Sequence, residues 1–132
     1  MPADFRSLLL ADAGVSSVVG SRISWGVRPQ GSALPAIVMH LIDAPVIYHL
    51  SGEGGPKESR IQIDCLAFGT LLNAMIVGDA VSLALSGYSG TVGGTQFQGI
   101  FQDSARDLSE TGAAEQQVFL FSIDFLARHQ PQ

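Results

Sequence analysis

The chain has 132 residues, of which 46% are hydrophobic and 14% charged, and its net charge is −5. This length predicts a single domain over residues 1–132, and the mean hydropathy of +0.29 excludes a largely disordered protein. The seven Lys and Arg residues are scattered along the sequence, which argues against a nucleic-acid-binding protein, because a phosphate backbone is bound by a basic face.

Cysteine content and the N-terminus indicate the compartment. The single cysteine, Cys65, excludes an intramolecular disulfide framework and a Cys-rich zinc site, so we expect a reducing environment. Residues 1–12 lack the basic and then apolar layout of a signal peptide, which favours the cytosol. The most apolar stretch, residues 71–85, contains polar side chains and falls short of the ~20 apolar residues of a membrane-spanning helix. We therefore expect no membrane partner.

The N-terminal third predicts one helix followed by irregular chain. Residues 4–12 place apolar side chains at helical spacing, and Gly14 is a plausible stop. Residues 21–25 can begin an extended segment, and residues 28–35, with two prolines and a glycine, predict a loop.

The next segments predict strands separated by a loop. Residues 36–42 are apolar and β-branched, which is typical of a buried strand, and we expect residues 46–50 to continue it or pair with it. A glycine-rich composition then predicts a mobile, solvated loop. The loop comprises Gly52, Glu53, Gly54, Gly55, Pro56 and Lys57.

Residues 60–65 give the clearest strand pattern of the chain. Ile61, Ile63 and Cys65 alternate with polar residues, so these three face a core and the polar residues face away.

Residues 70–86 predict a long helix with Thr70 as its N-cap and Gly87 as its stop. At 100° per residue, its polar members do not share one face, so the helix is apolar almost all round. Such a helix must be covered on more than one side.

The C-terminal part predicts a turn, two strands and irregular connections. We expect a turn at 88–94, a strand at 95–102, irregular chain at 104–114, a final strand at 116–127 and a frayed end at 129–132. The final strand is predicted to be central because large side chains alternate on one face: Phe119, Phe121, Ile123 and Phe125. The fold class is α+β, a mainly antiparallel sheet with two helices packed against it.

Catalytic glycine motifs are not supported by the sequence. Residues 87–90 approach a nucleophile elbow but have the wrong spacing and follow a helix, so we interpret them as a helix stop. Residues 52–55 carry a carboxylate and lead into a strand, unlike a phosphate-binding loop. We therefore predict no catalytic residue and no cofactor.

Polar side chains that can bind metals or act as acids and bases have simpler interpretations. His40, His49 and Asp43 form a conceivable metal trio, but His40 fits a buried strand and His49 a strand edge. Cys65 fits a small core residue better than a thiolate. Asp64 and Asp124 could be paired carboxylates, although ordinary solvated or interface positions are favoured.

The order of motifs resembles the tail-completion, or tail terminator, proteins of long-tailed bacteriophages and gene transfer agents. The resemblance covers most of the chain and rests on short pieces whose order is more specific than any one of them. The pieces are the N-terminal helix, residues 19–23, 29–31, 34–38, 51–52 and 58–65, a helix with Ala80, Ala84 and Leu85, and residues 122–125. Two features depart from the family pattern: Ala36 replaces an aromatic residue, and the long helix carries no basic residue.

The resemblance implies a structural virion protein without catalysis. Such proteins form a ring, commonly a hexamer, that caps the tail tube, stops its polymerisation and joins the head connector, while DNA passes through the lumen. The expected partners are copies of the chain, the tail tube protein and the head-tail connector or stopper protein. The expected location is the head-proximal end of the tail, after assembly in the bacterial cytoplasm.

The apolar helix supplies the predicted subunit interface, because ring closure through head-to-tail contacts needs two different patches on each subunit. We expect Leu72, Ile76 and Leu83 to pack between subunits, and the loop at 52–57 to order against a partner ring. Two alternatives stay open, a head-completion or neck ring protein and a ferredoxin-like ligand-binding or enzymatic domain.

Overall fold

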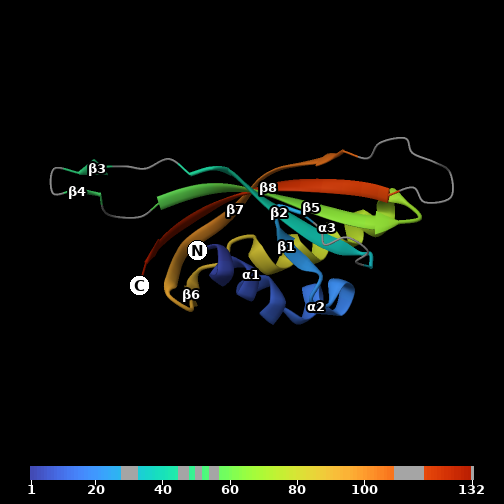
Figure 1. Cartoon of the computed structure of the whole chain (residues 1–132), viewed down its shortest axis with the longest axis horizontal. Coiled ribbons are helices and arrows are strands. Elements are labelled where there is room, and N and C mark those ends of the chain that lie inside the picture. Colours follow the sequence, from blue (N-terminus) through green and yellow to red (C-terminus); the bar gives the residue numbers. More distant parts are fainter. Residues whose placement is uncertain (28–32, 45–47, 50–51, 54–56, 109–117, 132) are drawn as a thin grey trace.

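The computed structural model describes residues 1–27, 33–44, 48–49, 52–53, 57–108 and 118–131. Within these ranges, the helices lie on one face of a curled six-stranded sheet (Figure 1), which confirms the predicted α+β class. The elements in chain order are α1 Pro2–Ala11, α2 Ala13–Val19, β1 Ile23–Trp25, β2 Ala36–Asp43, β3 Tyr48–His49, β4 Gly52–Glu53, β5 Lys57–Phe68, α3 Leu71–Leu85, β6 Gly90–Val92, β7 Thr95–Asp107 and β8 Val118–Pro131.

The sheet is antiparallel except at one edge. Its strand order is β1-β2-β5-β8-β7-β6, and only β1 and β2 run parallel. The two central strands, β5 and β8, pair along their whole length, from Lys57 opposite His129 to Phe68 opposite Val118. The predicted central position of the last strand is thus confirmed.

The core lies between the sheet and the helices. Ile61, Ile63 and Cys65 of β5 are fully buried, as the alternation predicted. Side chains from all three helices and from four further strands complete the core: Phe5, Leu9, Val15, Val19, Val77, Val81, Leu85, Ile23, Ile37, Met39, Phe97, Ile100, Ile123, Phe125 and Ala127.

The N-terminal helix is two helices. Asp12 ends α1, and its Oδ1 accepts a hydrogen bond from the backbone N–H of Val15 at 3.0 Å, so the same residue caps α2. The prediction of one helix over 4–12 missed α2, because β-branched valines at 15–19 disfavour a helix in isolation. Burial of Val15 and Val19 overrides that local preference.

The long helix begins and ends as predicted. The hydroxyl of Thr70 accepts a hydrogen bond from the backbone N–H of Asn73, and Gly87 has a φ of +77°, a conformation that favours glycine. Gly78 faces β8, where a Cβ atom would lie 2.8 Å from the ring of Phe121. The absence of a side chain therefore lets α3 lie close to the sheet.

Several predicted boundaries were wrong. The described residues of the 46–50 segment form β3, which pairs with β4 and not with β2. Gly52 and Glu53 of the predicted loop thus form β4, and Lys57 begins β5, whereas residues 54–56 lie outside the described part of the chain. For the predicted 28–35 loop, only residues 33–35 are described, and they have no regular structure.

The last two strands are longer than predicted. β7 continues through residues 104–107, where an irregular segment was expected, because β8 pairs with it to Asp107. β8 continues to Pro131, and the predicted fraying at 129–132 is wrong for the described residues. His129 is buried, and its Nε2 lies 2.8 Å from the hydroxyl oxygen of Ser59.

Candidate functional site

The outer side of α3 presents large apolar side chains to solvent. Leu72, Ile76 and Leu83 are 67%, 54% and 87% exposed, and we call these three residues the outer stripe. Their spacing of four and seven residues places them on one side of the helix. Asp79 lies in the same row, is exposed, and has no ion pair among the described residues.

The opposite side of α3 is buried against β5 and β8. Ala74, Val77, Gly78, Val81 and Leu85 form this inner side, which explains why the sequence showed no polar stripe. The single chain covers only the inner side. Full burial of an exposed Leu or Ile side chain contributes roughly 1.5–3 kcal/mol, so a partner that covered the outer stripe would gain binding free energy of this order for each side chain.

An apolar hollow lies next to the outer stripe. It has a volume of about 300 Å³ and lies where α2, the end of β5 and the start of α3 meet. Ile76 belongs both to this hollow and to the outer stripe, and Phe68 in its wall is 48% exposed. The apolar surface therefore continues beyond the helix to the end of the sheet.

A second group of exposed apolar residues lies after β1 and at the end of β2, near one edge of the sheet. Val27, Leu41 and Ile42 are 75%, 50% and 52% exposed, and we call them the edge patch. The sequence prediction missed the edge patch because residues 36–42 looked buried throughout. Only the first half of β2 is covered by β1, which pairs with Ile37, Val38 and Met39.

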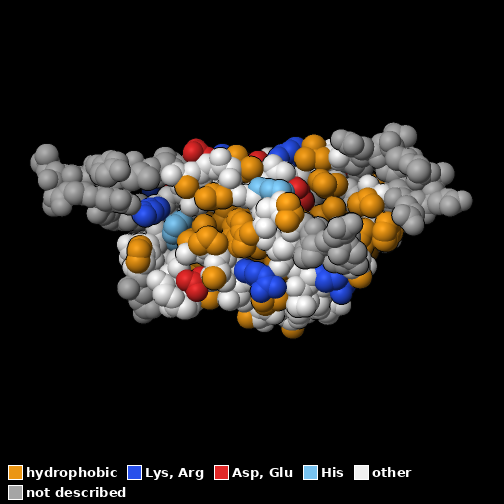
Figure 2. Space-filling model, in the orientation of Figure 1, with side chains coloured by type: hydrophobic (Ala, Val, Ile, Leu, Met, Phe, Trp, Pro, Cys, Tyr) orange, Lys and Arg blue, Asp and Glu red, His pale blue; other side chains and the backbone are white. Residues whose placement is uncertain are grey.

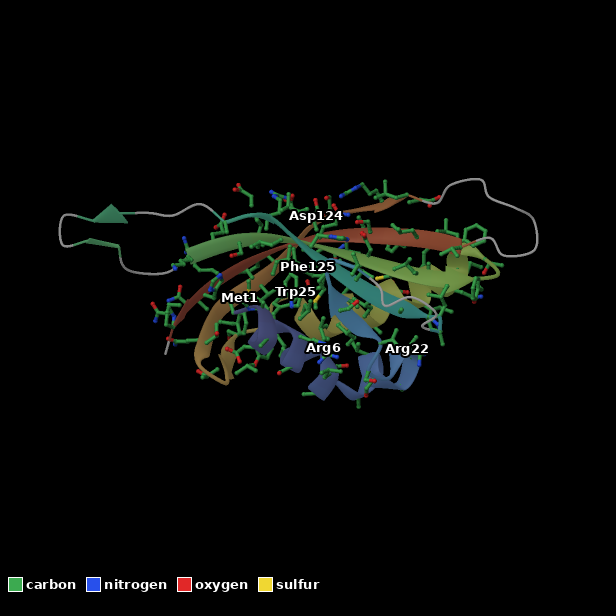
Figure 3. All side chains as sticks on the ribbon, in the orientation of Figure 1. Met1, Arg6, Arg22, Trp25, Asp124 and Phe125 are labelled. Atoms are coloured by element: carbon green, nitrogen blue, oxygen red, sulfur yellow. The ribbon has the colours of Figure 1, made fainter. Side chains whose placement is uncertain are left out.

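The helix-free face of the sheet carries a network of charged and polar side chains (Figure 3). Arg60 Nη1 lies 2.6 Å from a carboxylate oxygen of Asp103 and 3.6 Å from one of Asp124. Arg106 Nη2 donates to Asp124 at 3.2 Å and to Gln62 at 3.1 Å. These contacts join β5, β8 and β7 across their polar faces.

The same network continues to β2 and includes three of the candidate residues, His40, Asp64 and Asp124. Asp64 accepts a hydrogen bond from Gln62 at 2.9 Å, and its other oxygen lies 3.0 Å from Nε2 of His40. The His40 side chain is 34% exposed, so the expectation of a buried residue was wrong. Asp64 and Asp124 are each bound to other partners rather than to one another, which is the arrangement of a structural network.

The remaining candidates offer no assembled chemistry among the described residues. No group of three potential metal-ligating side chains occurs in the described ranges, and the side chain of His49 lies outside them. Burial raises the pKa of the Cys65 thiol, which suppresses its thiolate. The pairing of Ser59 with His129 escaped the sequence analysis because 70 residues separate them. Both are buried and lack the exposure of a nucleophile.

The predicted contact loop is only partly described. Gly52 and Glu53 pair with His49 and Tyr48 in a short two-stranded ribbon. This ribbon projects from one end of the molecule, away from the helices (Figure 1). Lys57 begins the long central strand β5 and lines a hollow of about 240 Å³ together with Asp4, Thr95 and His129.

Comparisons with known proteins identify the fold and the family of the chain. One chain of a solved structure described as the virion of a native gene transfer agent particle superimposes with a TM-score of 0.78 at 19% sequence identity, covering 98% of this chain and 93% of that chain. No curated protein matches the sequence. None of the described helices has the length and apolar character needed to cross a membrane. The family model for tail completion protein gp17 matches residues 3–130, and the chain therefore belongs to this family of structural tail-completion proteins.

Proposed function

We propose that six copies of the chain form a ring that caps the tail tube, ends its polymerisation and joins it to the head connector. The observation that carries this proposal is the outer stripe of α3, which a single chain leaves exposed in a protein of the tail-completion family. Large exposed apolar groups mark interaction surfaces. Assembly into a ring covers them without any catalytic step.

The proposed ring has a different partner on each side, the tail tube protein and the connector or stopper protein. The ribbon of β3 and β4 supports a role in such contacts, because it extends away from the folded body (Figure 1). We propose that residues 52–57 contact a neighbouring ring. The solved chain with the same fold comes from a gene transfer agent virion, and we propose the head-proximal end of a virion tail as the location of this chain.

Charge supports the passage of DNA without retention. Each chain has a net charge of −5, so six copies carry about −30. Carboxylates that line the lumen would repel the phosphates of a passing genome. The exposed Asp79 and the few basic residues of the chain favour this role over DNA binding.

The oligomeric state tests the proposal. Wild-type protein should sediment as a ring and show rings by electron microscopy, whereas Leu83→Asp should stay dissociated at the same concentration. Leu83→Met keeps an apolar side chain of similar volume and should assemble. Circular dichroism checks that each variant is folded. Wild-type protein that stays monomeric at all concentrations, also when tail tubes are added, contradicts the proposal.

Two alternatives are separated by further measurements. A neck ring one step closer to the head is distinguished by the neighbouring subunits in a particle reconstruction. A ligand-binding or enzymatic domain predicts a monomer that a small molecule stabilises thermally. The described hollows favour assembly, since their volumes of about 240 and 300 Å³ are at the lower end of ligand pockets, roughly 300–1,000 Å³.

A further inference from the structure

The molecule has two broad faces, and charged side chains are arranged differently on them. The helix-free face belongs to the sheet, and the opposite face, which we call the helical face, belongs to α1, α2 and α3 (Figure 1). Figure 2 shows acidic and basic side chains close together along the upper rim, where the helix-free face is seen edge-on. Two basic groups near the helices have no acidic group next to them in the same view. The two faces therefore offer different surfaces to a charged partner.

Two arginines of the helix-free face are bound to carboxylates. Arg60 Nη1 lies 2.6 Å from an oxygen of Asp103 and 3.6 Å from one of Asp124. Arg106 Nη2 lies 3.2 Å from the other oxygen of Asp124. Figure 3 shows Asp124 on the side of the sheet away from the helices. Both guanidinium groups thus have a carboxylate within ion-pair distance.

The third arginine of this face, Arg128, lies directly opposite Glu58 in the register of β5 and β8. Residues in directly opposite positions on one face of an antiparallel pair have neighbouring side chains, and opposite charges there attract one another. With Asp64 included, the described part of this face carries at least four carboxylates against three arginines. Each arginine of the described part of the face therefore has a carboxylate beside it.

The arginines of the helical face are bound to neutral groups instead. Arg6 donates to the carbonyl oxygens of Ile23 at 2.6 Å and of Ser21 at 3.3 Å. Arg22 donates to the carbonyl oxygen of Pro35 at 2.8 Å. Figure 3 labels both arginines beside α1 and α2. A carbonyl oxygen accepts the hydrogen bond but leaves the positive charge uncompensated.

The carboxylates of the helical face do not compensate these two arginines at close range. Asp4 accepts a hydrogen bond from the hydroxyl of Thr95 at 2.6 Å, and Asp12 caps α2. Asp79 is exposed on α3, in the row of the outer stripe. None of the three forms an ion pair with either arginine among the residues that the structure describes. The helical face thus combines uncompensated cations with exposed apolar side chains.

We propose that the helix-free face lines the lumen of the ring and borders the passing DNA, and that the helical face points away from the DNA. This inference rests on the proposed ring and adds which face of the subunit points inward. On the helix-free face a phosphate backbone meets no uncompensated arginine, and the excess of carboxylates repels it. A lumen lined by the helical face would present Arg6 and Arg22 of every copy to the phosphates and would retain the DNA.

Photo-crosslinking from matched positions tests which face borders the DNA. Benzoylphenylalanine replaces Phe101 or Ser104, which are exposed on the helix-free face opposite Leu126 and Asp124. The matched controls carry the same group in place of Ser7 or Ser17, which are exposed on α1 and α2. Particles that contain each variant are illuminated while they release DNA. Cross-links to DNA should form from positions 101 and 104 and not from positions 7 and 17.

Each other outcome contradicts a defined statement. Cross-links from positions 7 and 17 alone, or in equal yield from both faces, overturn the inference and leave the ring itself in place. Mass spectrometry of the particles shows that each variant chain is incorporated. Incorporated chains that cross-link to DNA from neither face contradict the proposed function, because DNA then does not pass through the ring.

A pair of added charges gives an independent measurement. Ser104→Arg adds an unpaired cation to the helix-free face of every copy, and Ser17→Arg adds the same cation to the helical face. Ser104→Arg should slow DNA release several-fold at low salt, whereas Ser17→Arg should release DNA as the wild type does. The delay should shrink at about 1 M salt, where the screening length falls to about 3 Å. A delay caused by Ser17→Arg and not by Ser104→Arg overturns the inference, and so does an equal delay in both.

Discussion

Leu83 and Leu85 are two residues apart on the same helix and have opposite surroundings. Leu85 is fully buried in the core, whereas Leu83 is 87% exposed. Since the side chains are chemically identical, the contrast comes only from the direction in which the helix presents them. It teaches that α3 holds the subunit together with its inner side and, as we propose, holds subunits to one another with its outer side. Substitutions on the two sides should therefore have separable effects.

The largest expected effect is the loss of subunit stability on the inner side. Leu85→Ala leaves a cavity in the core and should lower the free energy of unfolding by about 2–5 kcal/mol. Leu83→Ala should change it by no more than about 0.5 kcal/mol, because the side chain is exposed in the single chain. Urea unfolding of both variants, at a concentration where the wild type is dissociated, gives the two values.

Ring assembly should depend on Leu83 more than on Leu85, which is the opposite of the order expected for stability. Under conditions where the Leu85→Ala variant is still folded, it should form rings as the wild type does. The Leu83→Ala variant should form fewer rings than the wild type, although its subunit is stable. Similar losses of stability for both variants would show that the two sides of α3 do not have separate roles.

The next effect concerns the close packing of the inner side on β8. Gly78→Val places new atoms where a Cβ already lies 2.8 Å from the Phe121 ring, so overpacking should cost about 1–3 kcal/mol. Gly78→Ala should cost less, because it adds only one methyl group and improves helix propensity. Thermal unfolding should rank the proteins Gly, Ala and Val from most to least stable, and a Val variant as stable as the wild type contradicts the close contact.

A smaller effect is expected at the start of α3, which both sides of the helix share. Thr70→Ala removes the hydroxyl that accepts from the backbone N–H of Asn73 and should cost about 1 kcal/mol. Thr70→Ser keeps an acceptor at the same position and should stay close to the wild type. Unfolding in urea distinguishes them, and identical losses in Ala and Ser would assign the effect to the methyl group instead of the cap.

The smallest effect is a dependence on pH that does not involve α3. Burial, with smaller contributions from the N-terminal amine and Lys57, lowers the pKa of His129 below its ordinary value of 6.5. As the pH falls through about 6.5, the unfolded chain takes up a proton before the folded chain, so stability is full above this pH and declines below it. His129→Gln should flatten the change in urea midpoint between pH 7.5 and pH 5, and an unchanged slope would exclude His129 as its source.

Local signals in the sequence were sufficient for the strongest elements of the fold. Thr70 and Gly87 bracket α3, and the alternation around Ile61 identifies β5, because capping and period-two burial act within a few residues. The missed features depend on distant contacts. β8 remains ordered to Pro131 because Lys57 and Thr95 lie beside it, and no residue near the C-terminus signals these partners.

The sequence predicted one of the two exposed apolar surfaces, the outer stripe, and missed the edge patch. An almost uniformly apolar helix must have one side beyond the reach of its own sheet, so Leu72, Ile76 and Leu83 could be named, and the structure leaves them exposed. Their role between subunits stays a prediction. Leu41 and Ile42 could not be identified, since an apolar strand gives no local sign that its neighbour β1 ends after three residues.

The burial of Cys65 has a practical consequence for all of these measurements. It is the chain's only cysteine, it is fully shielded from solvent, and its raised pKa keeps the sulfur protonated. Thiol-reactive dyes should therefore leave the native protein unlabelled. A cysteine introduced at position 42 or 83 would then be the only labelled site of the chain. Mixing donor-labelled with acceptor-labelled protein and following the energy transfer between them would measure the rate of subunit association.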